Sequence, residues 1–172
     1  VASNLDIVGG DNQSAVVDTP FANNLTVRVS DRFGNAIANE TVNFIAPLAG
    51  SSAGLGSPLG TTNTAGLFSS EVQANTLAGS YGIQATSGLL SVNFALENDA
   101  DVADQLIISG LPTSSITAGD TAGFTVSALD RFGNLATEYN GTIDFATTDA
   151  QALLPGAATL TGGRGNFLSE PR

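Results

Sequence analysis

The chain has 172 residues, of which 42% are hydrophobic and only 12% are charged. This composition is too apolar and too weakly charged for intrinsic disorder, and no stretch is long and apolar enough to cross a bilayer. Sixteen acidic residues face five arginines, for a net charge of −11. Phosphate binding needs clustered Lys and Arg, so we expect no nucleic-acid partner and no membrane insertion.

Several residue types that commonly carry out catalysis are absent from the sequence. The sequence contains no His, no Cys and no Lys, so the usual general base, the thiol nucleophile and the Schiff-base amine are all absent. No pair of carboxylates lies in an obvious cleft-forming segment, as glycoside hydrolysis would require. We therefore expect a protein that is not an enzyme. The sequence begins at Val1 and has no Met, which we interpret as processing or excision from a longer chain.

An internal repeat of about one hundred residues organises the chain. Residues 25–35 (LTVRVSDRFGN) recur as residues 124–134 (FTVSALDRFGN), and residues 41–44 (TVNF) recur as residues 142–145 (TIDF). Within the repeat, apolar and polar residues alternate, which is typical of strands with one buried face. Short alternating segments separated by turn residues favour a β-sandwich over a βα unit.

Four motifs in the first copy carry a family resemblance: residues 9–14 (GGDNQS), 31–35 (DRFGN), 64–66 (TAG) and 78–85 (AGSYGIQA). They resemble the bacterial immunoglobulin-like, Big-1-like domains found in tandem in invasin- and intimin-type surface adhesins. The resemblance covers nearly all of residues 1–98 and covers the second copy more loosely. It implies an all-β fold of two tandem immunoglobulin-like sandwiches, and it implies no particular activity.

The resemblance also places the domains. Residues 1–98 form a complete domain, residues 99–104 an acidic linker, and residues 105–172 an incomplete domain that lacks its last two strands. The expected strands are 5–9, 24–30, 40–46, 67–74, 80–86 and 90–96 in the first copy and 105–109, 123–129, 141–147 and 166–170 in the second. The expected core of the first domain includes Val27, Val42, Phe44, Ile83, Val92 and Phe94. Tyr81 is expected to make a corner-type hydrogen bond to nearby backbone.

The DRFGN loop is the most distinctive local motif. Gly34 can adopt positive φ, and Asp31 can cap the turn by accepting hydrogen bonds from backbone N–H groups. Phe33 is expected to cover the end of the core. The exposed Arg32 leaves a ligand-binding role open beside this structural one. In the second copy the corresponding residues, with the same expected roles, are Gly133, Asp130, Phe132 and Arg131.

Residues 97–104 (ENDADVAD) hold four of the sixteen acidic residues. Ca²⁺ requires several hard oxygen ligands, which a flexible acidic segment can supply. In a tandem sandwich the DRFGN loop of the following domain also faces this junction. The sequence therefore suggests a calcium site, beside the alternative of a solvated acidic linker without a cation. Its candidate ligands are Glu97, Asp99, Asp101, Asp104 and Asp130.

We interpret the chain as a structural and adhesive stalk module of an extracellular, bacterial cell-surface protein. Its candidate partners are neighbouring repeats of a longer chain, other copies of itself and a host or surface ligand. Two alternatives stay open: a filament subunit assembled by β-strand exchange, and an accessory domain of an extracellular enzyme. The full-length sequence on both sides of these residues would discriminate among them.

The two missing strands predict an incomplete second domain with an open strand edge. Either the chain continues past Arg172, which we favour, or a neighbouring molecule donates a strand, for which residues 1–8 are a candidate. The absence is expected to bare the inner faces of Phe124, Val126, Ile143 and Phe145.

Overall fold

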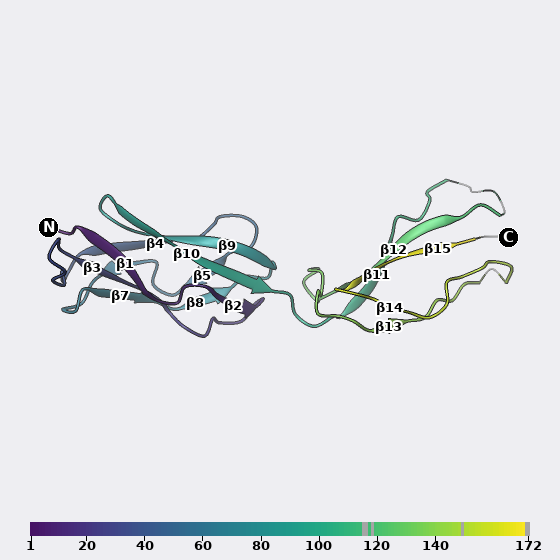
Figure 1. Ribbon diagram of the computed structural model, residues 1–172, viewed down its shortest axis with the longest axis horizontal. Coiled ribbons are helices and arrows are strands. Elements are labelled where there is room, and N and C mark those ends of the chain that lie inside the picture. The colour runs from purple at the N-terminus through teal and green to yellow at the C-terminus, as the bar shows by residue number, and fades with distance from the viewer. Residues whose placement is uncertain (115–116, 118, 149, 171–172) are drawn as a thin grey trace. The chain divides into compact units, whose positions relative to one another are not determined.

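The computed structural model describes residues 1–114, 117, 119–148 and 150–170, so the end of the expected second domain at 171–172 lies outside them. The chain divides into unit 1 (Val1–Asp99) and unit 2 (Ala100–Arg172), and its described residues form strands and no helix (Figure 1). Consequently, no helix in this part of the chain is long and apolar enough to span a membrane. The all-β fold expected from the sequence is confirmed.

Unit 1 contains ten strands, eight of which form two main sheets. One sheet has the order β1-β3-β7 and the other the order β2-β10-β9-β4-β6, while β5 pairs with β8 in a small ribbon. Pairing is antiparallel, except that β2 runs parallel to β10. The strands are β1 (Asn4–Gly9), β2 (Gln13–Val16), β3 (Leu25–Ser30), β4 (Thr41–Ile45), β5 (Ala53–Leu55), β6 (Leu59–Thr61), β7 (Leu67–Ser70), β8 (Val72–Ala74), β9 (Gly79–Ser87) and β10 (Leu90–Asp99).

The core of unit 1 lies between the two main sheets. Phe44 stacks on Phe68 with ring centroids 5.5 Å apart and meets Phe94 edge-on at 5.8 Å. Such offset and edge-on pairs are the arrangements that aromatic rings prefer. Val92, near the β9–β10 turn, packs against the core but is only half-buried. The other expected core residues are buried as predicted: Val27, Val42, Phe44, Ile83 and Phe94.

The chain changes sheets between β1 and β2, a step that the sequence did not reveal. Gly10 makes the step possible, because it has a φ of +84° and a Cβ there would overlap the carbonyl oxygen of Asn24. Only glycine adopts this conformation without steric cost. Asn12 follows with a φ of +52° and donates its N–H to the carbonyl of Ala95 at 3.0 Å. The step thereby brings β2 alongside the last strand of the unit.

Unit 2 repeats part of this plan. Its sheet β11-β12-β15 corresponds to β1-β3-β7, and its ribbon β13-β14 corresponds to β4-β6. The described residues of unit 2 contain no counterparts of β9 and β10. The strands are β11 (Gln105–Ser109), β12 (Ala122–Leu129), β13 (Thr142–Ile143), β14 (Ala158–Thr159) and β15 (Arg164–Ser169).

The small core of unit 2 corrects one expectation. Three phenylalanines fill it: Phe145 lies 5.6 Å from Phe124 and 4.9 Å from Phe167, measured between ring centroids. Phe124, Val126 and Ile143 are buried and Phe145 is half-buried. The prediction that these residues are bared is therefore wrong, because the rings close over one another.

Several strand limits also differ from the prediction. The expected strand at 67–74 is divided at Glu71 into β7 and β8, and the expected strand at 141–147 is reduced to Thr142–Ile143. Strands β5, β6 and β14 were not expected. Segments of two or three residues carry too few positions for a period-two pattern to be recognised.

Candidate functional site

The first DRFGN loop is built around the carboxylate of Asp31. Its Oδ1 accepts hydrogen bonds from the backbone N–H groups of Phe33 at 2.8 Å and Asn35 at 2.9 Å. Its Oδ2 accepts from the Asn35 side chain at 2.9 Å. These bonds, led by that from the Asn35 amide, lower the pKa of Asp31. The predicted turn-capping role is confirmed, and Gly34 supplies the expected positive φ of +85°.

The second loop has the same geometry and one additional bond. Asp130 Oδ1 accepts from the N–H groups of Phe132 and Asn134, each at 2.9 Å, and Oδ2 accepts from the Asn134 side chain at 2.9 Å. The backbone N–H of Asp101 donates a fourth bond to Oδ2 at 3.0 Å. Burial raises the pKa of the fully buried Asp130, but the bonds from Asn134, Asp101 and Phe132 outweigh it and hold that pKa below its usual value.

The aromatic residue of the first loop does not cover the core. The Phe33 side chain is 73% exposed, and the guanidinium of Arg32 lies over its ring, 4.5 Å from the centroid. In the second loop Arg131 lies 4.6 Å from the centroid of Phe132, which is half-buried. The prediction for Phe33 is wrong, because the ring turns outward and pairs with a cation on the loop surface.

Two of the five predicted calcium ligands lie on the last strand of unit 1. Strand β10 continues to Asp99, so Glu97 and Asp99 belong to a paired strand and not to a flexible segment. Both side chains are exposed, on the face opposite Phe94 and Leu96. The strand therefore orients both carboxylates toward solvent.

The other three predicted ligands belong to unit 2. Asp101 forms an ion pair with Arg131, at 3.6 Å between Oδ2 and Nε, and Asp104 is exposed. Each oxygen of Asp130 already accepts two hydrogen bonds, which occupies the lone pairs that a carboxylate offers. Across residues 1–114, 117, 119–148 and 150–170, no group of three or more acidic, His or Cys side chains is arranged to hold a metal ion.

The calcium site therefore stays a prediction. A cation that binds only the folded state raises stability with its concentration. Thermal unfolding measured in Ca²⁺ and in chelator checks it: a higher midpoint in Ca²⁺ would support the site, and superimposable curves would remove it.

A polar cluster at one end of unit 1 was not found by sequence reasoning. The Tyr81 hydroxyl donates to Asn98 Oδ1 at 3.0 Å, and the Asn98 amide lies within hydrogen-bonding distance of the Ser52 carbonyl, Asn75 Oδ1 and the Leu77 carbonyl. Burial raises the pKa of Tyr81 to about 12. The expected bond from Tyr81 to backbone is thus replaced by one to a side chain. Asn98 stands in the inward positions of β10, and the alternation from Phe94 would have indicated it.

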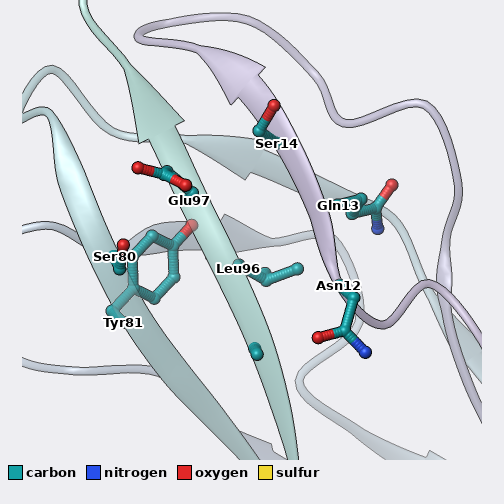
Figure 2. Close-up of a pocket in the computed structure, with 8 residues that line it drawn as sticks. Asn12, Gln13, Ser14, Ser80, Tyr81, Leu96 and Glu97 are labelled. Carbon is teal, nitrogen blue, oxygen red and sulfur yellow. The ribbon is translucent and has the colours of Figure 1, made fainter.

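An open groove of about 400 Å³ lies along β2, β9 and β10. Two of its polar side chains are already engaged: the Gln13 amide donates to the carbonyls of Gly10 and Asn23, and the Tyr81 hydroxyl donates to Asn98. Figure 2 shows its lining residues Asn12, Gln13, Ser14, Ser80, Tyr81, Leu96 and Glu97.

Comparison with known proteins identifies the fold. No protein-family model matches the sequence, and no curated protein matches it. Among solved structures, the chain is similar to FdeC, an adhesin of Escherichia coli, with a TM-score of 0.59 and 17% identity over 99% of this chain and 56% of that one. The Yersinia pseudotuberculosis adhesin InvE gives a TM-score of 0.49 and 15% identity over 98% of this chain and 52% of that one. The D0–D1 domains of intimin give 0.46 and 18% over 99% and 84%.

The fold assignment rests on FdeC, because the other two structures superpose less well. FdeC is an adhesin, and the chain shares its immunoglobulin-like fold. The chain spans just over half of the FdeC structure. At this level of identity the likeness concerns the fold, and function has to be argued from this chain's own geometry.

Proposed function

We propose that the chain is a non-catalytic stalk segment of an extracellular bacterial surface protein, whose immunoglobulin-like units transmit tension along the polypeptide. The resemblance to adhesin domains and the tandem repeat support a structural and adhesive role. The observation that carries the proposal is the parallel pairing of β2, near the start of unit 1, with β10 at its end.

The pairing forms a continuous patch of hydrogen bonds. Gln13 to Val16 lie opposite Leu96 to Asp99 in register. Two further bonds extend the patch at either end, from Asn12 N–H to the Ala95 carbonyl at 3.0 Å and from Val17 N–H to the Asp99 carbonyl at 2.9 Å. The Asp11 carboxylate adds another by accepting from Ala95 N–H at 2.8 Å.

Parallel pairing decides how this patch bears load. A pull on the two ends of unit 1 draws β2 and β10 in opposite directions along their axes. Interstrand hydrogen bonds lie across the strands, so this pull strains all of them together. An antiparallel hairpin pulled at its open end breaks its bonds one after another. Unit 1 is thereby suited to resist tension along the chain.

The start of unit 2 supports the same role. The segment that enters unit 2 is fastened at once, because Asp101 N–H bonds to Asp130, Asp104 N–H bonds to the Leu129 carbonyl at 2.8 Å, and Asp101 pairs with Arg131. Tension entering the unit is thus passed to β12 through backbone bonds.

Single-molecule pulling on the full chain tests the proposal. The sequence has no Cys, so two introduced cysteines define the attachment points. Attachment at Ser3 and Asp101 loads β2 against β10 in shear. Attachment at Ser80 and Glu97, which are exposed and lie opposite each other on β9 and β10, unzips that hairpin. We expect unit 1 to unfold at a several-fold higher force in the first geometry.

A matched control keeps the attachment points and changes one bond. Asp11→Ala removes the bond to Ala95 N–H and should lower the shear force while leaving the unzipping force unchanged. Equal forces in the two geometries would contradict the proposed load-bearing role. Of the alternatives, a filament subunit assembled by strand exchange would use β13, which pairs only with β14 in the described residues. No feature of these residues favours an accessory domain of an enzyme.

A further inference from the structure

The five-stranded sheet of unit 1 carries almost no charge. Its strands β2, β4, β6, β9 and β10 contain no basic residue, and Glu97 and Asp99 on β10 are their only acidic ones. Glu97 lines the open groove along β2, β9 and β10, whereas Asp99 does not. The groove of about 400 Å³ thus holds one carboxylate that no other side chain of this sheet neutralises.

The pairing of the strands places a hydroxyl on each side of this carboxylate. Glu97 lies opposite Ser80 on β9 and opposite Ser14 on β2 (Figure 2). Directly paired residues stand about 5 Å apart and point to the same face of a sheet, so the three exposed side chains form one row across three strands. Within the described ranges, none of the three side chains forms a hydrogen bond or an ion pair. The row therefore offers three acceptor groups to a ligand.

Small residues keep the space beside this row open. Ala95 stands two positions before Glu97 on the same face of β10 and lies opposite Gly82 on β9, so neither strand fills the groove with a long side chain. The carboxylate of Asp11 accepts a hydrogen bond from the Ala95 N–H at 2.8 Å and adds a second negative charge at the edge of the groove. On a chain of net charge −11, such a recess attracts cations.

We propose that this groove binds a basic side chain, of lysine or arginine, that is presented by a partner protein. The cationic group donates hydrogen bonds to the carboxylate of Glu97 and to the hydroxyls of Ser14 and Ser80, and bonds to an ionised acceptor are stronger than those between neutral groups. Sites for small molecules enclose most of their ligand, whereas this groove is open and fits one residue of a larger surface. The inference does not depend on the proposed load-bearing function.

Three short peptides test the proposal on the full chain at constant ionic strength. They are acetyl-Gly-Lys-Gly-amide, acetyl-Gly-Arg-Gly-amide and, as the neutral control, acetyl-Gly-Gln-Gly-amide. NMR titrations follow the backbone amides of Ser80, Ala95 and Glu97. At least one basic peptide should shift these amides in a saturable way, and the glutamine peptide should not. The basic peptide that binds more tightly identifies the preferred side chain.

Matched variants separate the groove from the overall charge of the chain. Glu97→Gln removes the carboxylate and should weaken binding of the basic peptide about tenfold, and Ser14→Ala with Ser80→Ala should weaken it about threefold. Glu71→Gln removes the same charge from an exposed position between β7 and β8, outside this sheet, and should leave binding nearly unchanged. All four side chains are exposed, so the variants should keep the fold.

Two results would overturn the proposal. One is equal binding of the basic peptide to the unchanged chain and to the Glu97→Gln variant, because the overall negative charge would then account for the attraction. The other is a shift at Ser80 and Ala95 that does not saturate with either basic peptide or that the glutamine peptide reproduces.

Discussion

Leu5 and Leu106 stand at the same place in the repeat, on strands that pair in the same way with their neighbours, and yet one is buried and the other half-exposed. The strand itself does not decide this. Burial of β1 depends on β10, which arrives more than eighty residues later in the sequence. The last hairpin of unit 1 contributes four of its fourteen buried core residues, Ile83, Ala85, Phe94 and Leu96, and also covers the apolar face of the first strand.

In the DRFGN loops the difference in burial is reversed, because the loop aspartate is more buried in unit 2 than in unit 1. The carboxylate of Asp31 accepts three hydrogen bonds and the residue is partly exposed, whereas the carboxylate of Asp130 accepts four and the residue is fully buried. The additional donor, Asp101 N–H, comes from the segment that enters unit 2. The DRFGN loop of unit 2 is thus held by one more hydrogen bond than that of unit 1.

The largest effect is expected from truncating matched core phenylalanines. Phe44→Ala should cost about 3–5 kcal/mol, because the ring is buried between Phe68 and Phe94 and its loss leaves a cavity. Phe145→Ala should cost less, because that ring is already partly exposed. Residue-resolved hydrogen exchange reads the two units separately. Equal losses would mean that unit 2 packs as well as unit 1.

A second pair tests the contribution of the hairpin directly. Leu5→Ala should destabilise unit 1 by about 2–4 kcal/mol, because a buried leucine is removed from between the sheets. Leu106→Ala should change the stability of unit 2 by less than about 1 kcal/mol, since its side chain is largely in water. Denaturant unfolding of both variants checks this. A large loss at Leu106 would show that β11 is covered in solution.

The third comparison concerns the loss of stability at acidic pH in the two DRFGN loops. The pKa values of Asp31 and Asp130 are lowered on folding, so their stabilisation is present above the unfolded pKa of about 3.9 and is lost as the pH falls through the lower folded values. Asp130→Asn should destabilise unit 2 by about 1–3 kcal/mol at neutral pH, because an NH₂ group then faces buried donors. It should also make the midpoint of thermal unfolding depend less on pH between about pH 5 and pH 3. Asp31→Asn should have a smaller effect on stability and on its pH dependence, because its loop is exposed.

The smallest effect is expected at Tyr81. Because burial raises the pKa of Tyr81 from 10.0 to about 12, its stabilisation is complete below the unfolded pKa and is lost as the pH rises through the folded value. Tyr81→Phe should cost about 0.5–1.5 kcal/mol by removing the bond to Asn98, and should reduce the alkaline loss of stability of unit 1. Tyr139→Phe in unit 2 is the control. An unchanged alkaline profile in Tyr81→Phe would assign that loss to other groups.

Much of the fold could be predicted from the sequence because it depends on local sequence patterns. The alternation in residues 25–30 predicted β3 and its buried face, and the repeat predicted β12. The DRFGN motif predicted its own turn, since the capping oxygen and the residues that it caps lie within five positions of each other.

The features that the sequence did not reveal depend on contacts between distant segments. The parallel pairing of β2 with β10 joins residues more than eighty positions apart, and the role of Asn98 depends on loops that contain Ser52, Asn75 and Leu77. The outward turn of Phe33 also escaped prediction, because an aromatic side chain in a loop is compatible with either orientation.

The sequence by itself determined the strand class, the tandem repeat and the capped loops, because alternation, turn chemistry and self-similarity are local properties of a chain. The tertiary structure alone decided which apolar residues are left in water. It buried Phe124 and Ile143 behind a cluster of rings and left Leu106 and Ile108 exposed. The alternating pattern assigns a residue to one face of a strand, but only the packing of other segments determines whether that face is covered.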